Sequence, residues 1–142
     1  MSEITVRDAA AAELAQLLRL AEVAVPGEVI VAGGDLAAAT LQRTLAGDRV
    51  FVAECEGRRV GYAAVSEAEP ALVLDQLVVA ATDQGRGVGH ALLDWVEGYG
   101  VSRGLQTVRV PATGADQRAR DFYLRRGYLD GGPVLERELV HA

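Results

Sequence analysis

The 142-residue sequence predicts an α/β (α+β mixed) fold with a central mixed, mostly antiparallel β-sheet flanked by helices on both faces. Three observations predict it. Apolar side chains alternate with a period of two over short stretches in the middle of the chain, which indicates strands joined as antiparallel hairpins. After residue 87 the period becomes helical. Strands and helices then alternate, which implies partly parallel pairing.

The first part of the chain is predicted to hold one strand and two helices. The strand lies around residues 4–6. Leucine and alanine residues spaced along one face predict a helix over residues 9–23, which ends before Pro26. A second helix, capped by Asp35, is predicted to end near Leu45.

Three strands are predicted to follow, over residues 50–53, 60–64 and 72–79. Turns are expected at Glu56 and over residues 67–70. The third strand is a nearly continuous apolar run, which is typical of a strand covered on both faces. A single carboxylate, Asp75, interrupts that run, on the side that alternation would share with Val73, Leu77 and Val79.

The remaining elements follow in the order helix, strand, helix and strand. The clearest helix is predicted from Gly87 to about Gly104, because apolar residues recur on one face. These residues are Val88, Ala91, Leu92, Trp95, Val96 and Tyr99. A strand is predicted over residues 107–110, a helix over 115–126 and a last strand over 134–140. The predicted order is β-α-α-β-β-β-α-β-α-β.

Composition excludes several classes of function. The formal net charge is −6, which disfavours nucleic acid as a partner. All 14 basic residues are arginine, so the lysine of a phosphate-loop NTPase and the lysine of a Schiff-base enzyme are both missing. Cys55 is the single cysteine, so an intrachain disulfide cannot form, and with only two histidines we expect no metal site.

The location expected from the sequence is the cytoplasm. The first residues lack the apolar stretch of a secretory signal. No apolar run reaches the roughly 18 residues that a membrane span needs, so no membrane partner is expected.

The glycine-rich turn that precedes the long helix is the most informative segment. Backbone N–H groups in such a turn and in the first helical turn have no intrahelical acceptor, and the helix dipole adds a positive end. The segment can therefore cradle a pyrophosphate. A glycine turn with nothing bound remains an alternative. A dinucleotide fingerprint is disfavoured, because the motif Gly85-x-Gly87-x-Gly89 lies past the midpoint and no carboxylate ends the next strand.

Taken together, the second half of the chain resembles the GNAT superfamily of acyl-CoA N-acyltransferases. The resemblance covers residues 72–128 and rests on three elements in the right order. They are Leu77-Val78-Val79, then Gln84-x-x-Gly87-x-Gly89, then Ala119-x-x-Phe122-Tyr123-x-x-x-Gly127-Tyr128. The resemblance implies a GNAT-like acyl-CoA N-acyltransferase fold and a single N-acetyltransferase domain over residues 1–142.

The resemblance also implies the residues that bind acetyl-CoA. In this family the strand that corresponds to residues 72–79 separates from the next strand near a bulge, and the pantetheine arm lies in the gap between the two strands. Backbone groups of Leu77, Val78 and Val79 would hold that arm, and the Val79 amide would face the thioester oxygen. The pyrophosphate would lie against Gln84, Gly85, Arg86, Gly87, Val88, Gly89 and His90. Asp116 stands where the family often has asparagine, and it is a further candidate cofactor contact.

Two residues are the catalytic candidates. Tyr123 matches the family tyrosine that gives a proton to the departing thiolate, and its hydroxyl would also lie beside the cofactor sulfur. The alternative for Tyr123 is an aromatic residue of the core. Asp75 is the candidate base or anchor for the substrate ammonium, because a carboxylate inside an apolar strand is costly without a partner or a function. The alternative for Asp75 is an aspartate at an exposed strand end.

The function implied is an N-acetyltransferase that moves an acetyl group from acetyl-CoA, without a metal, to a primary amine of a small molecule or peptide in a ternary complex. Members of the family often dimerise, so a homodimer is left open. Two alternatives remain. One is a non-catalytic acyl-CoA-binding regulatory module with the same fold, and the other is a structural or interaction domain that binds no CoA.

Overall fold

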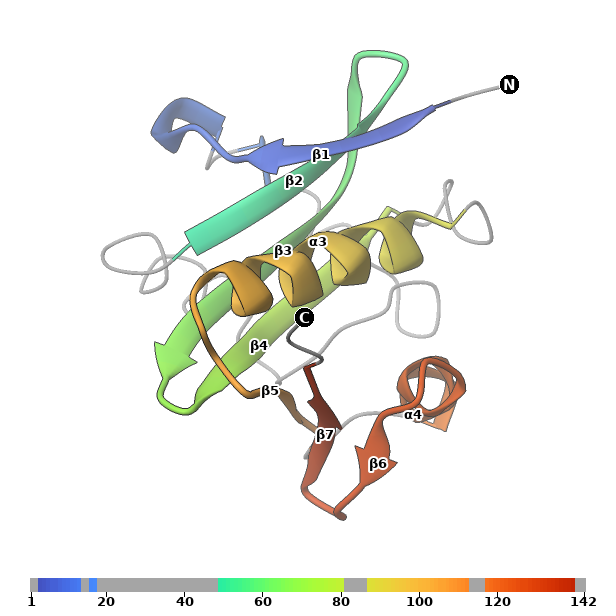
Figure 1. The fold of residues 1–142 in the computed structure, drawn as a ribbon. Coiled ribbons are helices and arrows are strands. Elements are labelled where there is room, and N and C mark those ends of the chain that lie inside the picture. Colours follow the sequence, from blue (N-terminus) through green and yellow to red (C-terminus); the bar gives the residue numbers. More distant parts are fainter. Residues whose placement is uncertain (1–2, 14–15, 18–48, 81–86, 113–116, 140–142) are drawn as a thin grey trace.

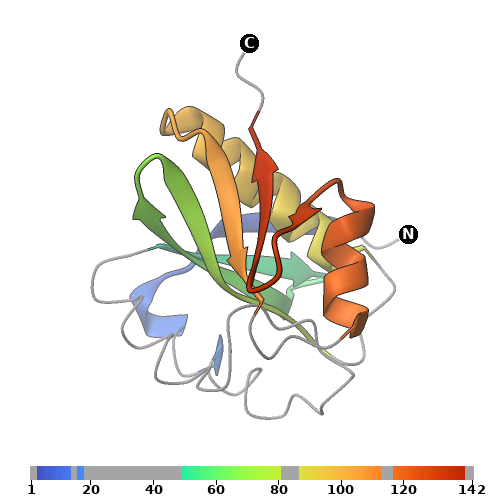
Figure 2. The ribbon, with the colours of Figure 1, turned by 90° about the horizontal axis from the view of Figure 1, so that it is seen from below.

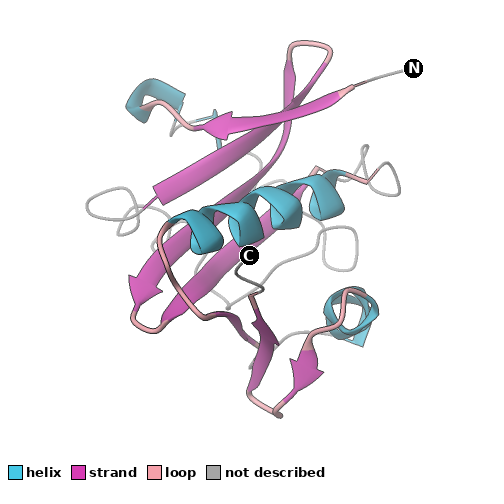
Figure 3. Ribbon diagram, in the orientation of Figure 1, coloured by secondary structure: helices cyan, strands magenta, loops and turns pink. Residues whose placement is uncertain are grey.

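The structure is a computed structural model, and it describes residues 3–13, 16–17, 49–80, 87–112 and 117–139 (Figure 1). Seven strands form one sheet in the order β1-β2-β3-β4-β5-β7-β6 (Figure 3). The strands are β1 Ile4–Asp8, β2 Arg49–Cys55, β3 Arg58–Ala68, β4 Ala71–Val79, β5 Thr107–Pro111, β6 Leu129–Asp130 and β7 Val134–Glu138. The helices are the 3₁₀ turn η1 Ala11–Glu13, α3 Val88–Ser102 and α4 Gln117–Arg125.

The pairing of the strands confirms the predicted mixed, mostly antiparallel sheet. Strands β4 and β5 pair in parallel, and the other pairings among the described strands are antiparallel. A parallel pair needs a crossover connection, and α3 supplies it. Helix α3 lies across the face of β3 and β4, whereas α4 lies beside β6 and β7 (Figures 1 and 2).

Some predicted boundaries were wrong. Strand β3 runs on to Ala68 and pairs there with Ala71, so the predicted turn over residues 67–70 is shorter than expected. The two-residue strand β6 was not predicted, because it is too short to show a period. Within the predicted helix over residues 9–23 the structure describes η1 and a helical pair at residues 16–17. The helix predicted to begin at Asp35 lies outside the described residues.

Apolar side chains cover both faces of the sheet, as the nearly continuous apolar run in β4 predicted. Under α3 they form one large cluster that includes Leu74, Leu92 and Tyr123. On the opposite face Leu17, from the helical pair of residues 16–17, packs in a second cluster with Tyr62. The sheet therefore carries helical residues on both faces, as predicted.

The buried stripe of α3 is shifted from the stripe that the sequence predicted. Its buried residues are Val88, Gly89, Leu92, Leu93, Val96 and Gly100. Trp95, predicted on the apolar face, is 44% exposed and meets the ring of Phe51 edge-on at 6.2 Å between centroids. Helix α3 is apolar over more than half of its circumference, so spacing alone did not identify the side that faces the sheet.

Candidate active site

The edge of β4 next to β5 is paired with β5 over only a short part of its length. Strand β4 pairs with β5 only through Ala71, Leu72 and Val73, and β4 then continues to Val79 without a paired residue in β5. The other edge of β4 stays paired with β3 as far as Val79, opposite Gly61. The sheet is thus split between β4 and β5 at the carboxyl ends of both strands.

The register of β4 determines which backbone groups face this split. The amide of Ala80 donates to the carbonyl of Val60 in β3 at 2.8 Å. Successive residues of a strand direct their N–H groups to opposite edges, so the amide of Val78 also faces β3. The amides of Leu77 and Val79 therefore face the split, where backbone groups that have no partner in β5 can bind an extended ligand.

The amino end of α3 meets the same region. Gly87 is its N-cap, with a left-handed φ of 84°, and as a glycine it has no side chain to cap the helix. A Cβ atom at Gly87 would meet no atom of the described residues within 4 Å. The first helical hydrogen bond joins the Ala91 amide to the Gly87 carbonyl, which leaves the amides of Val88, Gly89 and His90 without a helical acceptor. The first turn of α3 holds no acidic residue that would oppose a phosphate.

Three residues predicted for the pyrophosphate lie outside the described residues, namely Gln84, Gly85 and Arg86. Asp116, the further candidate cofactor contact, also falls in a segment that the structure does not describe. The structure therefore places the helical half of the predicted cradle, Gly87 to His90, together with the backbone of Leu77 to Val79.

Tyr123 lies on the buried face of α4, in the same cluster as Val79 and Val88. Its side chain is 1% exposed, and its ring lies between those of Phe122 and Tyr128, at 5.2 and 5.5 Å between centroids. The hydroxyl oxygen is buried and makes no hydrogen bond within the part of the chain that the structure describes. Buried hydroxyl groups normally have a partner, so this one fits a ligand atom.

Burial also sets the protonation state of Tyr123. Loss of solvent around the hydroxyl raises the pKa of Tyr123 above its ordinary value of about 10. The phenol therefore carries its proton at neutral pH and can donate it.

Asp75 lies at a β-bulge in β4. The resemblance implied a bulge near this strand, but the sequence did not place it at Asp75. In the pairing of β4 with β3, Ala64 lies opposite Gln76 and Val65 lies opposite Leu74, so Asp75 is the extra residue of β4. The bulge changes the alternation of the strand. Leu74 before it and Leu77 after it both belong to the cluster under α3.

The prediction that Asp75 shares the side of Leu77 and Val79 was therefore wrong. Leu74 faces α3, so alternation directs Asp75 to the opposite face of the sheet, together with Gln76. The bulge also accounts for the tolerance of a carboxylate at this point of an otherwise buried strand, because Asp75 is only partly buried.

Sequence reasoning missed the polar pair beside Asp75. The Tyr62 hydroxyl donates to Oε1 of Gln76 at 2.6 Å, and both side chains are almost fully buried. Burial raises the pKa of Tyr62, so its hydroxyl remains a donor at neutral pH. The two residues face each other only because the bulge shifts the register by one, and no local pattern shows such a shift.

Gly61 was also missed. A Cβ atom at this position in β3 would lie 2.7 Å from the carbonyl oxygen of Val78, 3.1 Å from Val88 and 3.3 Å from Leu92. The absence of a side chain at Gly61 therefore lets the first turns of α3 approach the sheet beside Val79. A glycine inside a predicted strand is the signal that could have found it.

Other observations bear on the class of site. Among the described residues no group of histidine, cysteine, aspartate and glutamate side chains could hold a metal ion. None of the helices that the structure describes is long and apolar enough to cross a membrane. A cavity of about 350 Å³ on α3, lined by Asp94, Trp95, Gly98, Tyr99 and Ser102, includes none of the predicted site residues.

Comparison with known proteins agrees with this geometry. A profile of the acetyltransferase (GNAT) domain family matches residues 46–129. No curated protein sequence matches the chain.

Solved structures resemble the whole chain. The ribosomal-protein-S18-alanine N-acetyltransferase of Escherichia coli is 16% identical, with 99% of this chain and 96% of that chain covered and a TM-score of 0.77. A GNAT family acetyltransferase of Brucella melitensis in complex with acetyl-CoA is 16% identical, with 97% and 89% covered and a TM-score of 0.76. A GNAT family acetyltransferase of Staphylococcus aureus Mu50 is 12% identical, with 97% and 100% covered and a TM-score of 0.78. At such identities the likeness shows a shared fold.

Proposed function

Because the chain belongs to the GNAT acetyltransferase family, we propose that it transfers an acetyl group from acetyl-CoA to a primary amine of a small molecule or peptide. Both reactants would be bound together, so that the amine attacks the thioester directly. Holding the two in one complex supplies much of the rate enhancement, since a bimolecular step becomes effectively unimolecular.

One observation carries the proposal. The split between β4 and β5 brings an edge of β4 that does not pair with β5 next to the amino end of α3, and a buried tyrosine hydroxyl without a partner among the described residues lies in the same core cluster. An extended thiol arm attached to a pyrophosphate has the chemistry to satisfy all three. The arm can pair with the strand edge, the phosphates can accept from the helix amides, and the sulfur can accept from the phenol.

Acetyl-CoA supplies the activated acetyl group, and the residues of this chain supply its surroundings. The amides of Val88, Gly89 and His90 would hold the pyrophosphate, with Gln84, Gly85 and Arg86 completing the cradle. The Val79 amide would donate to the carbonyl oxygen of the thioester, where negative charge develops. Tyr123, protonated at neutral pH, would give its proton to the departing thiolate.

Asp75 is the proposed base or anchor for the substrate ammonium, although it lies on a different side of β4 than expected. Its place at the bulge directs the carboxylate to the sheet face opposite α3. An amine would then approach from the face opposite the helix that binds the pyrophosphate. The E. coli neighbour is named for an alanine of a ribosomal protein, which supports an amine as the acceptor class.

The test is a thioester-consumption screen across amines and peptide amino termini, with a thermal shift on CoA and acetyl-CoA run beside it. Cys55 is the single cysteine and is 2% exposed, so a thiol-reactive dye reports released CoA with little background from the folded protein. We expect stabilisation by acetyl-CoA and CoA release that depends on an added amine.

The outcomes separate the alternatives. A thermal shift without transfer to any amine would support the non-catalytic acyl-CoA-binding module. No thermal shift at all would support a structural or interaction domain and would contradict the proposal. A cytoplasmic location and a homodimer stay predictions.

A further inference from the structure

A single arginine links the two helices that carry the candidate site. Arg126 follows the last residue of α4, and its side chain is only 13% exposed. Its Nη2 donates to Asp94 at 2.9 Å and to Glu97 at 3.0 Å. Its Nη1 lies 3.2 Å from Nδ1 of His90. His90, Asp94 and Glu97 follow one another along α3 at about one turn each, so one guanidinium binds that side of the helix from its first turn onward.

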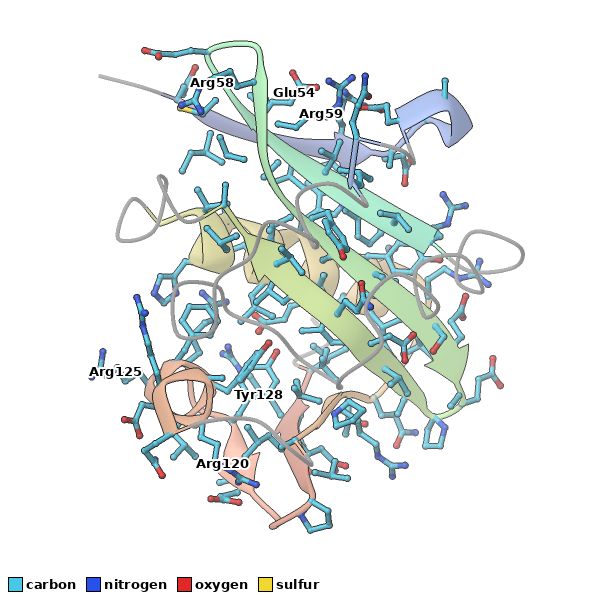
Figure 4. All side chains as sticks on the ribbon, turned by 180° about the vertical axis from the view of Figure 1, so that it is seen from behind. Glu54, Arg58, Arg59, Arg120, Arg125 and Tyr128 are labelled. Atoms are coloured by element: carbon cyan, nitrogen blue, oxygen red, sulfur yellow. The ribbon has the colours of Figure 1, made fainter. Side chains whose placement is uncertain are left out.

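The contacts continue from Glu97 to the ring of Tyr123. Oε2 of Glu97 accepts from the Tyr128 hydroxyl at 2.8 Å, and Tyr128 packs edge-on against Tyr123. Figure 4 labels Tyr128 beside α4. His90 packs on the ring of Phe122, the residue before Tyr123, at 4.9 Å between centroids. Arg126 thus joins the helix that presents the phosphate amides to the helix that presents the phenol.

The contact with His90 determines which ring nitrogen carries the proton. A guanidinium can only donate hydrogen bonds, so Nδ1 of His90 must be the acceptor. A neutral imidazole that accepts at Nδ1 carries its proton on Nε2. The His90 side chain is exposed in the first turn of α3, next to the amides of the cradle. Its Nε2–H is therefore a donor of the kind that a phosphate oxygen accepts.

The burial of one nitrogen of the Arg126 guanidinium supports a positioning role. Its Nε atom is buried and makes no hydrogen bond within the residues described. Buried N–H groups without partners are rare in proteins, because the desolvation of the group is not recovered. The side chain is oriented so that its two terminal nitrogens reach α3. The same orientation leaves Nε buried without a hydrogen bond to any described residue.

We propose that Arg126 is a positioning residue for acetyl transfer: it holds His90 in the Nε2–H tautomer beside the phosphate cradle and holds α4, with Tyr123, against α3. This inference rests on the proposed function for its catalytic consequence. The tautomer of His90 is a property of the ligand-free protein and does not depend on any activity.

The first measurement is the tautomer of His90 by ¹H–¹⁵N correlation of the imidazole nitrogens, at about pH 8, above the ordinary histidine pKa. The chain has two histidines, and a His141→Gln variant assigns the remaining signals to His90. We expect the Nε2–H tautomer in the parent protein and a mixture of tautomers in Arg126→Met. A parent protein with the Nδ1–H tautomer or a mixture would overturn the proposal.

The second measurement compares the CoA Kd and kcat of three variants. Arg126→Met should lower kcat by about tenfold or more, since small misplacement of reacting groups costs that much. Arg126→Lys keeps the charge but cannot reach all three acceptors of α3. Its kcat should therefore fall between the kcat of Arg126→Met and that of the parent. The control is Arg103→Met, which removes an exposed ion pair with Glu67 at the other end of α3 and should change kcat by less than about twofold.

The two measurements separate the failures. If the parent protein shows no transfer to any amine, the proposed function fails, and the tautomer result still decides whether Arg126 sets His90. If the parent turns over and both Arg126 variants match it in kcat, the positioning role is wrong. If Arg126→Met does not fold, Arg126→Lys, with the same two readouts, carries the test.

Discussion

At the scale of single residues, Tyr123 combines three properties that suit an acid. Its hydroxyl is buried, it has no hydrogen-bond partner among the described residues, and burial keeps it protonated. A hydrogen-bond partner normally compensates for the desolvation of a phenol in the apolar core. Tyr62 shows the ordinary arrangement, since its hydroxyl donates to Gln76.

This contrast yields a paired prediction. Tyr123→Phe should lower kcat by about a hundredfold while the CoA Kd changes by less than about threefold, because the proton donor is lost but the ring remains. The ligand-free variant should be as stable as the parent, since the lost hydroxyl had no partner among the described residues. Tyr62→Phe, the matched control, should cost about 0.5–1.5 kcal/mol of unfolding free energy by removing the hydrogen bond to Gln76. Urea unfolding and steady-state kinetics measure both, and an unaltered kcat in Tyr123→Phe would remove the acid role.

Asp75 gives a prediction of its own. Replacing its carboxylate by an amide removes a base without changing the size of the side chain, so Asp75→Asn should change the pH dependence of kcat/KM and lower its value at neutral pH. Asp130→Asn, in the exposed edge strand β6, is the control and should leave the profile as it is. A profile of Asp75→Asn identical to that of the parent would mean that the base lies elsewhere.

At the scale of elements, the close approach of α3 to the sheet depends on Gly61. A methyl group there would lie 2.7 Å from a backbone carbonyl that cannot rotate away, so the strand or the helix must shift. The first turn of α3 is the part that lies over this position, and it carries the amides that are proposed to bind the pyrophosphate. The geometry of the cradle is therefore coupled to one residue of β3.

Gly61→Ala should accordingly destabilise the protein by about 1–3 kcal/mol and weaken CoA binding, because the overpacked contact displaces the start of α3. Gly98→Ala is the matched control within α3: its Cβ atom would meet nothing within 4 Å, and we expect stabilisation of about 0.5–1 kcal/mol from the better helix former. Urea unfolding and CoA titration measure both effects. Equal stabilities of the two variants would contradict the tight contact at Gly61.

The split between β4 and β5 predicts a pattern in hydrogen exchange. The amides of Val78 and Ala80 are paired with β3, whereas those of Leu77 and Val79 face the split. Addition of CoA should slow exchange at Leu77 and Val79 and leave Val78 nearly unchanged, since only the first two gain an acceptor. Residue-resolved exchange with and without CoA checks this. Equal protection of all three amides would argue against binding in the split.

At the scale of the whole molecule, an ion cluster around the buried carboxylate of Glu13 ties β1 and η1 to the β2–β3 end of the sheet. The Glu13 carboxylate accepts from both terminal nitrogens of Arg7 at 2.7 and 2.9 Å, from Nε of Arg59 at 2.6 Å and from the Ala10 amide at 2.8 Å. Arg7 also pairs with Glu54, and Figure 4 labels Glu54 and Arg59 close together at that end of the sheet.

This cluster predicts how the stability of the protein depends on pH. Hydrogen bonds from Arg7 hold the pKa of Glu13 well below its ordinary value. The stabilisation is therefore complete above the unfolded-state pKa of about 4.3 and is lost as pH falls below it. Glu13→Gln should be less stable than the parent at pH 7, and the difference should shrink at pH values below about 4. Glu3→Gln, an exposed control, should follow the parent, and a pH-independent difference for Glu13→Gln would contradict the assignment.

How much of the fold and the site could be predicted from the sequence depends on how far apart in the chain the interacting residues lie. The central strands and helices α3 and α4 were predicted because they rest on periods and glycine placements within about 15 residues. The side of β4 that Asp75 occupies, the Tyr62–Gln76 pair and the stripe of α3 that is buried were not. Each depends on contacts between segments that are distant in the sequence.

What the sequence by itself determined is most of the described elements, the family and the chemical groups available: amides at a glycine turn, a phenol on the last helix and a carboxylate in an apolar strand. Only the tertiary structure decided how these groups meet. One extra residue at Asp75 exchanges the two faces of β4, the end of pairing with β5 leaves the Val79 amide facing the split, and Arg126 joins α4 to α3. Register and helix docking are set by packing across the whole sheet, and local periodicity carries no information about either.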